Sequence, residues 1–347
     1  MRWLMAGLIA LLAVMPAHTK PLAPADLHSA DAVLRWINGY RSKPDPKAVP
    51  AAMQALSRLG ALQDLERCGV YVGFLAGVIG SNPESAEALI GKTLEIQRND
   101  RWIVVRAIAY SGLPDWKFLL QKFAARMPER AAMIEKYLTG KSPTLDQLVI
   151  APSPSALQRI GEHLRVEAVF GKPKRKAMLE PSPEVLDILW GYYFATGSYG
   201  PIMSIVAMLP WSVDHDDVER LSIGSMAKFT LASNATHDFD LLAALKGSSK
   251  ARNQPETTVA ALNEVTDAAE TVEIARIRKQ AIAAIDELRR KGPAYRRSAS
   301  WWGYVGQSAI AGGCIAAAVT GHIEFGLPCV VGGAAASAVV NFVNNQP

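Results

Sequence analysis

Residues 65–83 read LERCGVYVGFLAGVIGSNP, and this segment decides the fold. The chain is strongly apolar through Ile79 and then reaches Gly80 and the turn residues Asn82 and Pro83. Glycine and proline in these positions typically end a helix. The segment therefore predicts one apolar helix from Leu65 to Ile79.

The segment Ile103–Pro114 repeats this pattern further along the chain. Like Val72–Pro83, it is an apolar stretch that runs into a Gly and then a Pro. Helix pairs punctuated in this way indicate a stacked α-solenoid that resembles the tetratricopeptide kind. The Trp, Leu-Gly, Tyr and Phe positions of that repeat do not recur. An irregular α-helical domain is the alternative interpretation.

Helical spacing of apolar residues continues on both sides of these segments. Val33, Leu34, Ile37 and Tyr40 form one stripe, with Ser29 or Asp26 as the N-cap. The other helices expected in the body are Met53–Leu59 (ended by Gly60), Ala86–Leu94, Trp102–Tyr110, Leu119–Met127, Ala131–Leu138, Ile202–Leu209, Asp216–Leu231 and Phe239–Leu245, with a loop at Gly247–Ser249. The segment Val185–Phe194 is rich in aromatic residues and is expected to be buried. No segment alternates as a half-buried strand would. The sequence predicts an all-α body.

The chain divides into five parts by composition. They are residues 1–19, a signal peptide; 20–150, a repeat-like helical domain; 151–254, a second helical region; 255–297, a long amphipathic helix with a basic end; and 298–347, a hydrophobic hairpin. The long helix is expected from Glu256 to Arg290, where neither Gly nor Pro occurs. The 347 residues are half hydrophobic and 20% charged, which suits a packed core.

The amino-terminal residues indicate export. Arg2 precedes an apolar run from Trp3 to Met15, and small residues follow it, as in a secretory signal. We expect the mature chain to begin between Ala17 and Pro21, in a bacterial-type periplasm or cell envelope. An uncleaved signal anchor is the alternative.

The carboxyl-terminal segment Ser298–Pro347 carries charge only at its centre, at His322 and Glu324. Small residues recur there at four-residue spacing, which lets helix backbones approach closely. These residues are Ala309, Gly313, Ala317 and Gly321 on one arm and Cys329, Gly333 and Ser337 on the other. A membrane-associated helical hairpin is the prediction.

Two features flank this hairpin on its amino-terminal side. The aromatic pair Trp301 and Trp302 suits the membrane interface. A basic cluster suits contact with anionic lipid headgroups, and its members are Arg289, Arg290, Lys291, Arg296 and Arg297. Membrane lipids are therefore expected partners.

The three cysteines are too few for a disulfide framework, and their spacing fits no zinc motif. Cys314 and Cys329 lie equally far from a turn between Gly321 and His322, which makes them candidates for one disulfide across the hairpin. Cys68 lies in the body.

Two motifs in the body could carry chemistry. Ser225 and Lys228 form an S-x-x-K motif, as in a serine nucleophile activated by lysine. The other signatures of such hydrolases are absent, so a solvated helix face is the simpler interpretation. The second motif is a run of potential metal ligands, Asp214, His215, Asp216 and Asp217 with His237, Asp238 and Asp240. We expect no metal there, and Asp214 or Asp216 has a role as the cap of the next helix.

The formal net charge of +5 is modest, and the basic residues are scattered except near Arg289–Arg297, which argues against a nucleic-acid partner. We expect an exported, membrane-associated, non-enzymatic protein that needs no cofactor and binds another envelope protein. One alternative is a membrane-inserting or pore-forming protein that uses the hairpin. The other is a serine hydrolase built on Ser225 and Lys228.

Overall fold

The computed structural model describes residues 27–64, 67–151, 177–214, 217–252 and 254–271. Regular structure within them is helical, with one isolated parallel bridge between Leu148 and Leu179. The α-helices are α1 (Ala30–Gly39), α2 (Val49–Arg58), α3 (Gly69–Ser81), α4 (Ala86–Thr93), α5 (Trp102–Tyr110), α6 (Trp116–Ala124), α7 (Ala131–Leu138), α9 (Pro183–Thr196), α10 (Tyr199–Ala207), α11 (Val218–Ala235), α12 (Phe239–Ser249) and α13 (Glu256–Thr271). The 3-10 turns are η2 (Tyr40–Ser42), η4 (Pro83–Ser85), η5 (Arg98–Asp100), η6 (Pro128–Arg130), η7 (Leu145–Gln147) and η8 (Leu209–Val213). The all-α prediction is confirmed.

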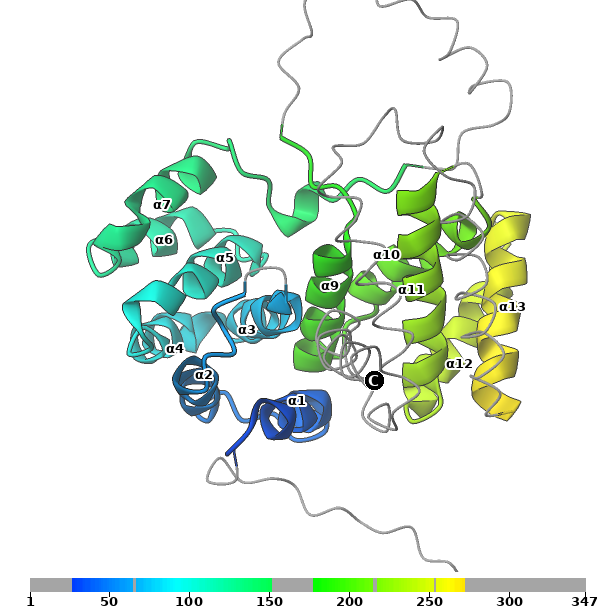
Figure 1. Cartoon of the computed structure of the whole chain (residues 1–347), viewed down its shortest axis with the longest axis horizontal. Helices are drawn as coiled ribbons and strands as arrows, with labels where there is room; N and C mark the ends of the chain where they lie inside the picture. Colours follow the sequence, from blue (N-terminus) through cyan, green and yellow to red (C-terminus); the bar gives the residue numbers. More distant parts are fainter. Residues whose placement is uncertain (1–26, 65–66, 152–176, 215–216, 253, 272–347) are drawn as a thin grey trace, which may run out of the picture.

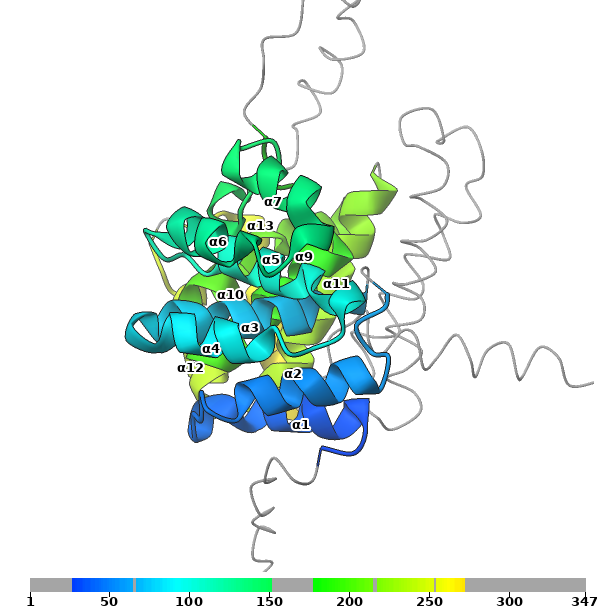
Figure 2. The same ribbon diagram turned by 90° about the vertical axis from the view of Figure 1, so that its left-hand side faces the viewer.

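The first seven helices stack as pairs. Figure 2 shows them rising in chain order from α1 at the bottom to α7 at the top. Helices α1, α3 and α5 begin pairs with α2, α4 and α6, and α3 also contacts α5 while α2 contacts α4. Gly60 and Gly112 adopt the left-handed conformation (φ +71° and +74°) where α2 and α5 end. These are the two glycines expected to end those helices.

Helix α9 packs against α3 (Figure 1), and glycines from both helices lie in this contact. A Cβ atom at Gly73 would lie 1.9 Å from the carbonyl oxygen of Ile188. A Cβ atom at Gly191 would lie 2.1 Å from that of Val70. The two backbones therefore touch with no side chain between them.

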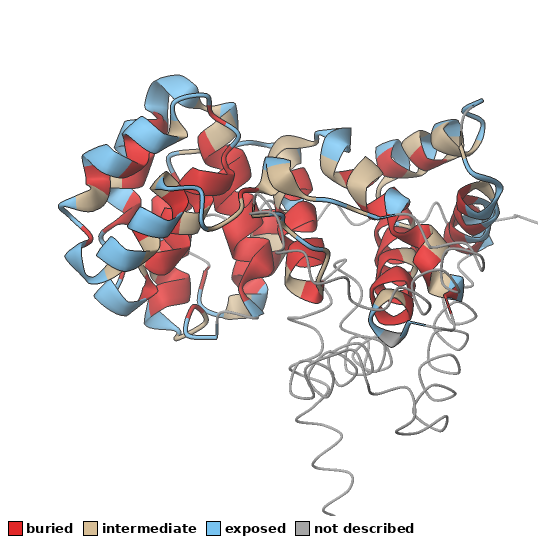
Figure 3. Ribbon diagram, turned by 90° about the horizontal axis from the view of Figure 1, so that it is seen from above, coloured by how far each residue is buried: buried red, intermediate tan, exposed pale blue. Residues whose placement is uncertain are grey.

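The second half of the body is built around α11. Its residues from Leu221 to Ala235 are buried except Lys228, because η8, α12 and α13 pack around it. Trp190 of α9 donates a hydrogen bond from Nε1 to Oγ1 of Thr230 at 3.1 Å. One hydrophobic core thus runs from α1 through α9 to α13, and the buried central helices are visible in Figure 3.

Several helix boundaries differ from the sequence predictions. The helix expected from Leu65 begins at Gly69, and the loop expected at Gly247–Ser249 is the last turn of α12. A Cβ atom added at Gly247 would have no other atom within 4 Å, and the helix continues through this glycine to Ser249. Asp217 caps α11 by accepting from the Arg220 backbone N–H, in place of Asp214 or Asp216.

The long helix expected over Glu256–Arg290 is described as far as Thr271, and its remainder lies outside the described residues. The signal peptide, the basic cluster and the hairpin of residues 298–347 also lie outside them. Within the part that is described, no helix combines the length and apolarity needed to cross a membrane.

The α3–α9 contact gives a direct test. Gly73→Ala should lower the free energy of unfolding by about 3 kcal/mol, because the methyl group meets backbone atoms that side-chain motion cannot relieve. The matched control Gly247→Ala, in open space on α12, should raise it by about 0.5 kcal/mol. Urea unfolding followed by circular dichroism measures both. A Gly73→Ala variant as stable as the parent would contradict the close crossing.

Candidate functional site

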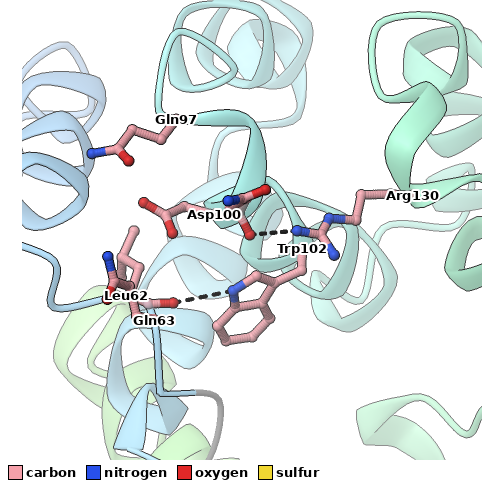
Figure 4. Close-up of a pocket in the computed structure, with 7 residues that line it drawn as sticks. Leu62, Gln63, Gln97, Asp100, Trp102 and Arg130 are labelled. Carbon is pink, nitrogen blue, oxygen red and sulfur yellow. Dashed lines mark hydrogen bonds between the residues drawn. The ribbon is translucent and has the colours of Figure 1, made fainter.

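A pocket of about 280 Å³ lies where three turns of the stacked helix pairs meet. The turns are the one after α2, the η5 turn before α5, and the η6 turn before α7. Its lining residues are Leu62, Gln63, Gln97, Asn99, Asp100, Trp102 and Arg130. Figure 4 shows these side chains and the separate turns from which they come, with Gln97 and Arg130 on opposite sides of the view.

Asp100 forms the charged inner wall and is only 2% exposed. Its Oδ2 atom accepts a hydrogen bond from Oγ of Ser57 at 2.6 Å. The same Ser57 hydroxyl accepts from the backbone N–H of Gln97 at 3.1 Å, and the Gln97 side chain donates to the Ser57 carbonyl at 3.0 Å. A buried carboxylate is stabilised by such charge-assisted bonds, so Asp100 is held in one position.

Trp102 and Leu62 close the apolar side of the pocket, and both are buried. The indole Nε1 of Trp102 donates to the carbonyl oxygen of Leu62 at 3.2 Å, as drawn in Figure 4. This bond joins the first turn of α5 to the turn that follows α2.

Arginines fix the turns through backbone carbonyl groups. Arg101 donates to Leu94 at 3.1 Å and to the carbonyl of Arg126 at 2.8 Å, and Arg126 donates to Gly91 at 3.1 Å. Arg130 donates from Nη2 to the carbonyl of Asn99 (Figure 4). The pocket is therefore built on a rigid frame, as binding sites generally require.

One charged group of the pocket has an atom without a hydrogen-bond partner. The Nε atom of Arg130 is buried and has no partner among the described residues. The guanidinium group is held instead through Nη2, which donates to the carbonyl oxygen of Asn99.

The sequence predictions did not include these lining residues. The signal was the charge-dense run Arg98-Asn99-Asp100-Arg101 directly before an apolar helix. Such a run is usually a solvated turn. Only the folded structure shows that Asp100 is buried and that Gln63 and Arg130 line the same pocket.

Ser225 and Lys228 lie on α11, and the interpretation as a solvated helix face is wrong for both. Ser225 is 3% exposed because α11 is the central helix of its half. The Lys228 side chain is 12% exposed and forms an ion pair with Glu264 of α13. The lysine nitrogen thus has a carboxylate partner on another helix.

The acidic run around α11 and α12 serves the helix ends. Asp217 caps α11, and Oδ1 of Asp238 accepts from the Leu241 backbone N–H at 3.0 Å to cap α12. The other oxygen of Asp238 accepts from the Tyr193 hydroxyl at 2.7 Å and pairs with Arg41. Burial and this contact with Asp238 raise the pKa of Tyr193.

No group of three or more His, Cys, Asp or Glu is arranged to hold a metal within the described ranges, and His215 and Asp216 lie outside them.

Cys68 is buried, and its thiol donates to the carbonyl oxygen of Ala61 at 3.2 Å. Burial raises the pKa of this thiol to about 12, so it stays protonated at neutral pH. Cys314 and Cys329 lie outside the described residues, so their disulfide stays a prediction. The same holds for the predicted membrane residues Trp301, Trp302, Ala309, Gly313, Ala317, Gly321, Gly333 and Ser337 and for Arg289, Arg290, Lys291, Arg296 and Arg297.

Comparison with known proteins gives no relative: no protein-family model, curated protein or solved structure matches the chain significantly. The function has to be argued from the fold and the pocket.

The frame of the pocket can be tested through Ser57. Ser57→Ala should lower the free energy of unfolding by about 1–3 kcal/mol, because it removes a hydrogen bond from buried Asp100 and leaves the Gln97 N–H without its acceptor. Ser42→Ala, at an exposed position after α1, should change it by less than about 0.5 kcal/mol. Thermal unfolding of the two variants and the parent measures these differences in stability. Equal stability would show that the Ser57–Asp100 bond does not hold the pocket.

Proposed function

We propose that the protein is a partner-binding scaffold of the cell envelope, and that its helical body receives another protein at the pocket between the turns. The observation that carries this proposal is a pocket between the turns that is lined by Asp100, Arg130 and three carboxamide side chains. Stacked helix pairs present long surfaces, and this arrangement commonly serves protein binding.

The packing of α9 favours the edge formed by the turns, rather than the face of α3, as the place where a partner binds. That face is already covered, and backbone contact at Gly73 and Gly191 leaves no room for a partner between the helices. The pocket lies outside this contact, and its rim residues Gln63, Gln97 and Asn99 are exposed. A partner can reach the pocket without disturbing the core.

The amino-terminal signal and the carboxyl-terminal apolar segment support the envelope location. Both come from the sequence alone, since residues 1–26 and 272–347 lie outside the described part. In this proposal the export signal directs the body across a membrane and residues 298–347 hold it there.

Site-specific photo-cross-linking in cells tests the partner site. A photoreactive residue in place of Gln63 or Asn99, on two sides of the pocket, should give the same adduct. The control is Lys250, an exposed position in the turn after α12. Mass spectrometry of the adducts should identify one envelope protein at both rim positions and not at the control. Different adducts at the two rim positions, or an equal yield at Lys250, would overturn the pocket as the partner site.

Membrane attachment is tested by alkaline extraction. The full chain should stay in the membrane pellet, whereas a chain that ends at Arg297 should be released, because it lacks the apolar segment. The matched control carries the conservative replacement Gly313→Ala in the full chain and should remain in the pellet. Release of the full chain, or retention of the shortened one, contradicts attachment through residues 298–347.

A further inference from the structure

We infer that α11 carries a docking face for the carboxyl-terminal segment of this same chain, and that residues 298–347 cover this face before the protein attaches to a membrane. The inference rests on the membrane attachment proposed above and adds the state from which attachment starts. In that state the apolar segment is bound to the body, and a membrane then replaces α11 as its partner.

Three sides of α11 are assigned by specific contacts. Thr230 accepts a hydrogen bond from α9. A Cβ atom at Gly224 would lie 2.3 Å from a backbone nitrogen of η8, so η8 packs on that side. Lys228 forms an ion pair with α13. Figure 1 accordingly shows α11 between α9 and α13.

The fourth side of α11 is buried as well, although none of these contacts involves it. Successive residues of an α-helix are about 100° apart, which places four residues within about 80° of one another on this side. The centre of the group lies about 100° or more from the three contact residues above. Its members, here called the serine face, are Ser222 (2% exposed), Ser225 (3%), Phe229 (4%) and Ser233 (3%).

The chemistry of the serine face indicates a contact surface. Serine is mostly an exposed residue, yet three serines are buried here. The hydroxyl oxygen of Ser233 is buried and has no hydrogen-bond partner among the described residues. Because buried polar groups are nearly always bonded, this oxygen points to a contact that the described residues do not supply. The face carries no charge, and its small side chains let another helix approach closely.

Residues 298–347 match this face in chemistry. They carry charge only at His322 and Glu324, so they can cover an uncharged surface without burying an unpaired charge. Exposure of so apolar a segment to water is unfavourable, and it therefore needs a cover until it reaches a membrane. The connecting residues 272–297 carry charges throughout and fit the face less well.

The connection to α13 lets the segment reach the face. Residues 272–297 can span about 39 Å as a helix and about 90 Å when extended, whereas the 18 residues of α11 are about 27 Å long. The connection starts at Thr271, the end of a helix that itself packs on α11. A segment tethered so close has a high effective concentration at the face, which favours it over a separate partner.

Photo-cross-linking within the full chain tests the docking. The chain is made by cell-free synthesis without membranes or detergent, with p-azidophenylalanine in place of Phe229. Irradiation should give an intrachain adduct that peptide mapping places in residues 298–347. Vesicles of phosphatidylcholine and phosphatidylglycerol should abolish the adduct, because the segment moves into the lipid. The same replacement at Phe118, which is 61% exposed on α6, should give no adduct with residues 298–347.

Alkylation of Ser225→Cys keeps the test valid if the azide disturbs the fold. Without vesicles the new thiol should resist alkylation, as the buried native Cys68 does. With vesicles it should react while Cys68 stays protected. Ser85→Cys, at an exposed position on η4, should react in both conditions.

Several outcomes would overturn the inference. An adduct in residues 272–297, or in any other part of the chain, would assign a different cover. Rapid alkylation of Ser225→Cys without vesicles would show that the face is open, and an adduct that vesicles leave unchanged would refute the exchange with lipid. Aggregation of the full chain without vesicles would show that the apolar segment has no cover. Alkaline extraction is independent of these measurements: if the full chain still stays in the pellet, attachment stands and only the docking on α11 fails.

Discussion

The contact between α3 and α9 is the constraint on which the rest of the structure depends. Gly73 and Gly191 bring two helix backbones together so closely that an added methyl group on either would overlap a carbonyl group of the other. Such packing gains many van der Waals contacts per residue and tolerates no change of register. Because α9 carries the chain from the stacked pairs into the second half, this contact fixes the position of both.

Polar contacts follow from that placement. Arg106 of α5 is partly buried beside Tyr110 and pairs with Glu184 in the first turn of α9. Burial by itself would lower the pKa of this guanidinium, yet Glu184 and the nearby tyrosine raise it, so the charge persists. The pair is partly buried, and it adds a specific polar contact to a packing that apolar residues already hold. Trp190 of α9 likewise makes a specific polar contact with α11, through its hydrogen bond to Thr230.

Much of this architecture could be predicted from the sequence, and the failures have physical causes. Apolar spacing and turn glycines located most helices, since these signals are local: α5 and α7 have the predicted bounds, and Gly60 and Gly112 end their helices. Four-residue spacing of small residues was assigned to the segment after Ser298, but Gly69, Gly73 and Gly77 show the same spacing in α3. A glycine in an apolar run does not show which distant helix approaches it.

The residues of the candidate site were harder to predict than the fold. The S-x-x-K motif drew attention to Ser225 and Lys228, which lie on the central helix α11 and serve packing and an ion pair. Asp100 and Arg130 carried no motif. They share a pocket only because successive helix pairs bring their turns to one edge, and that alignment is a property of the stack. Charged residues in turns are common, so their spacing alone indicates nothing.

Helix α13 has a mechanical consequence for the whole molecule. It is the last described helix, and it holds to the body through one apolar face and two ion pairs, Lys228 with Glu264 and Lys246 with Glu270. A force applied at Thr271 enters the body through this helix. Its contacts lie along one side and can separate one after another, whereas the α3–α9 crossing would have to break at once. Tension applied at Thr271 would therefore separate α13 from α11, α12 and η8 before it disrupts the α3–α9 contact.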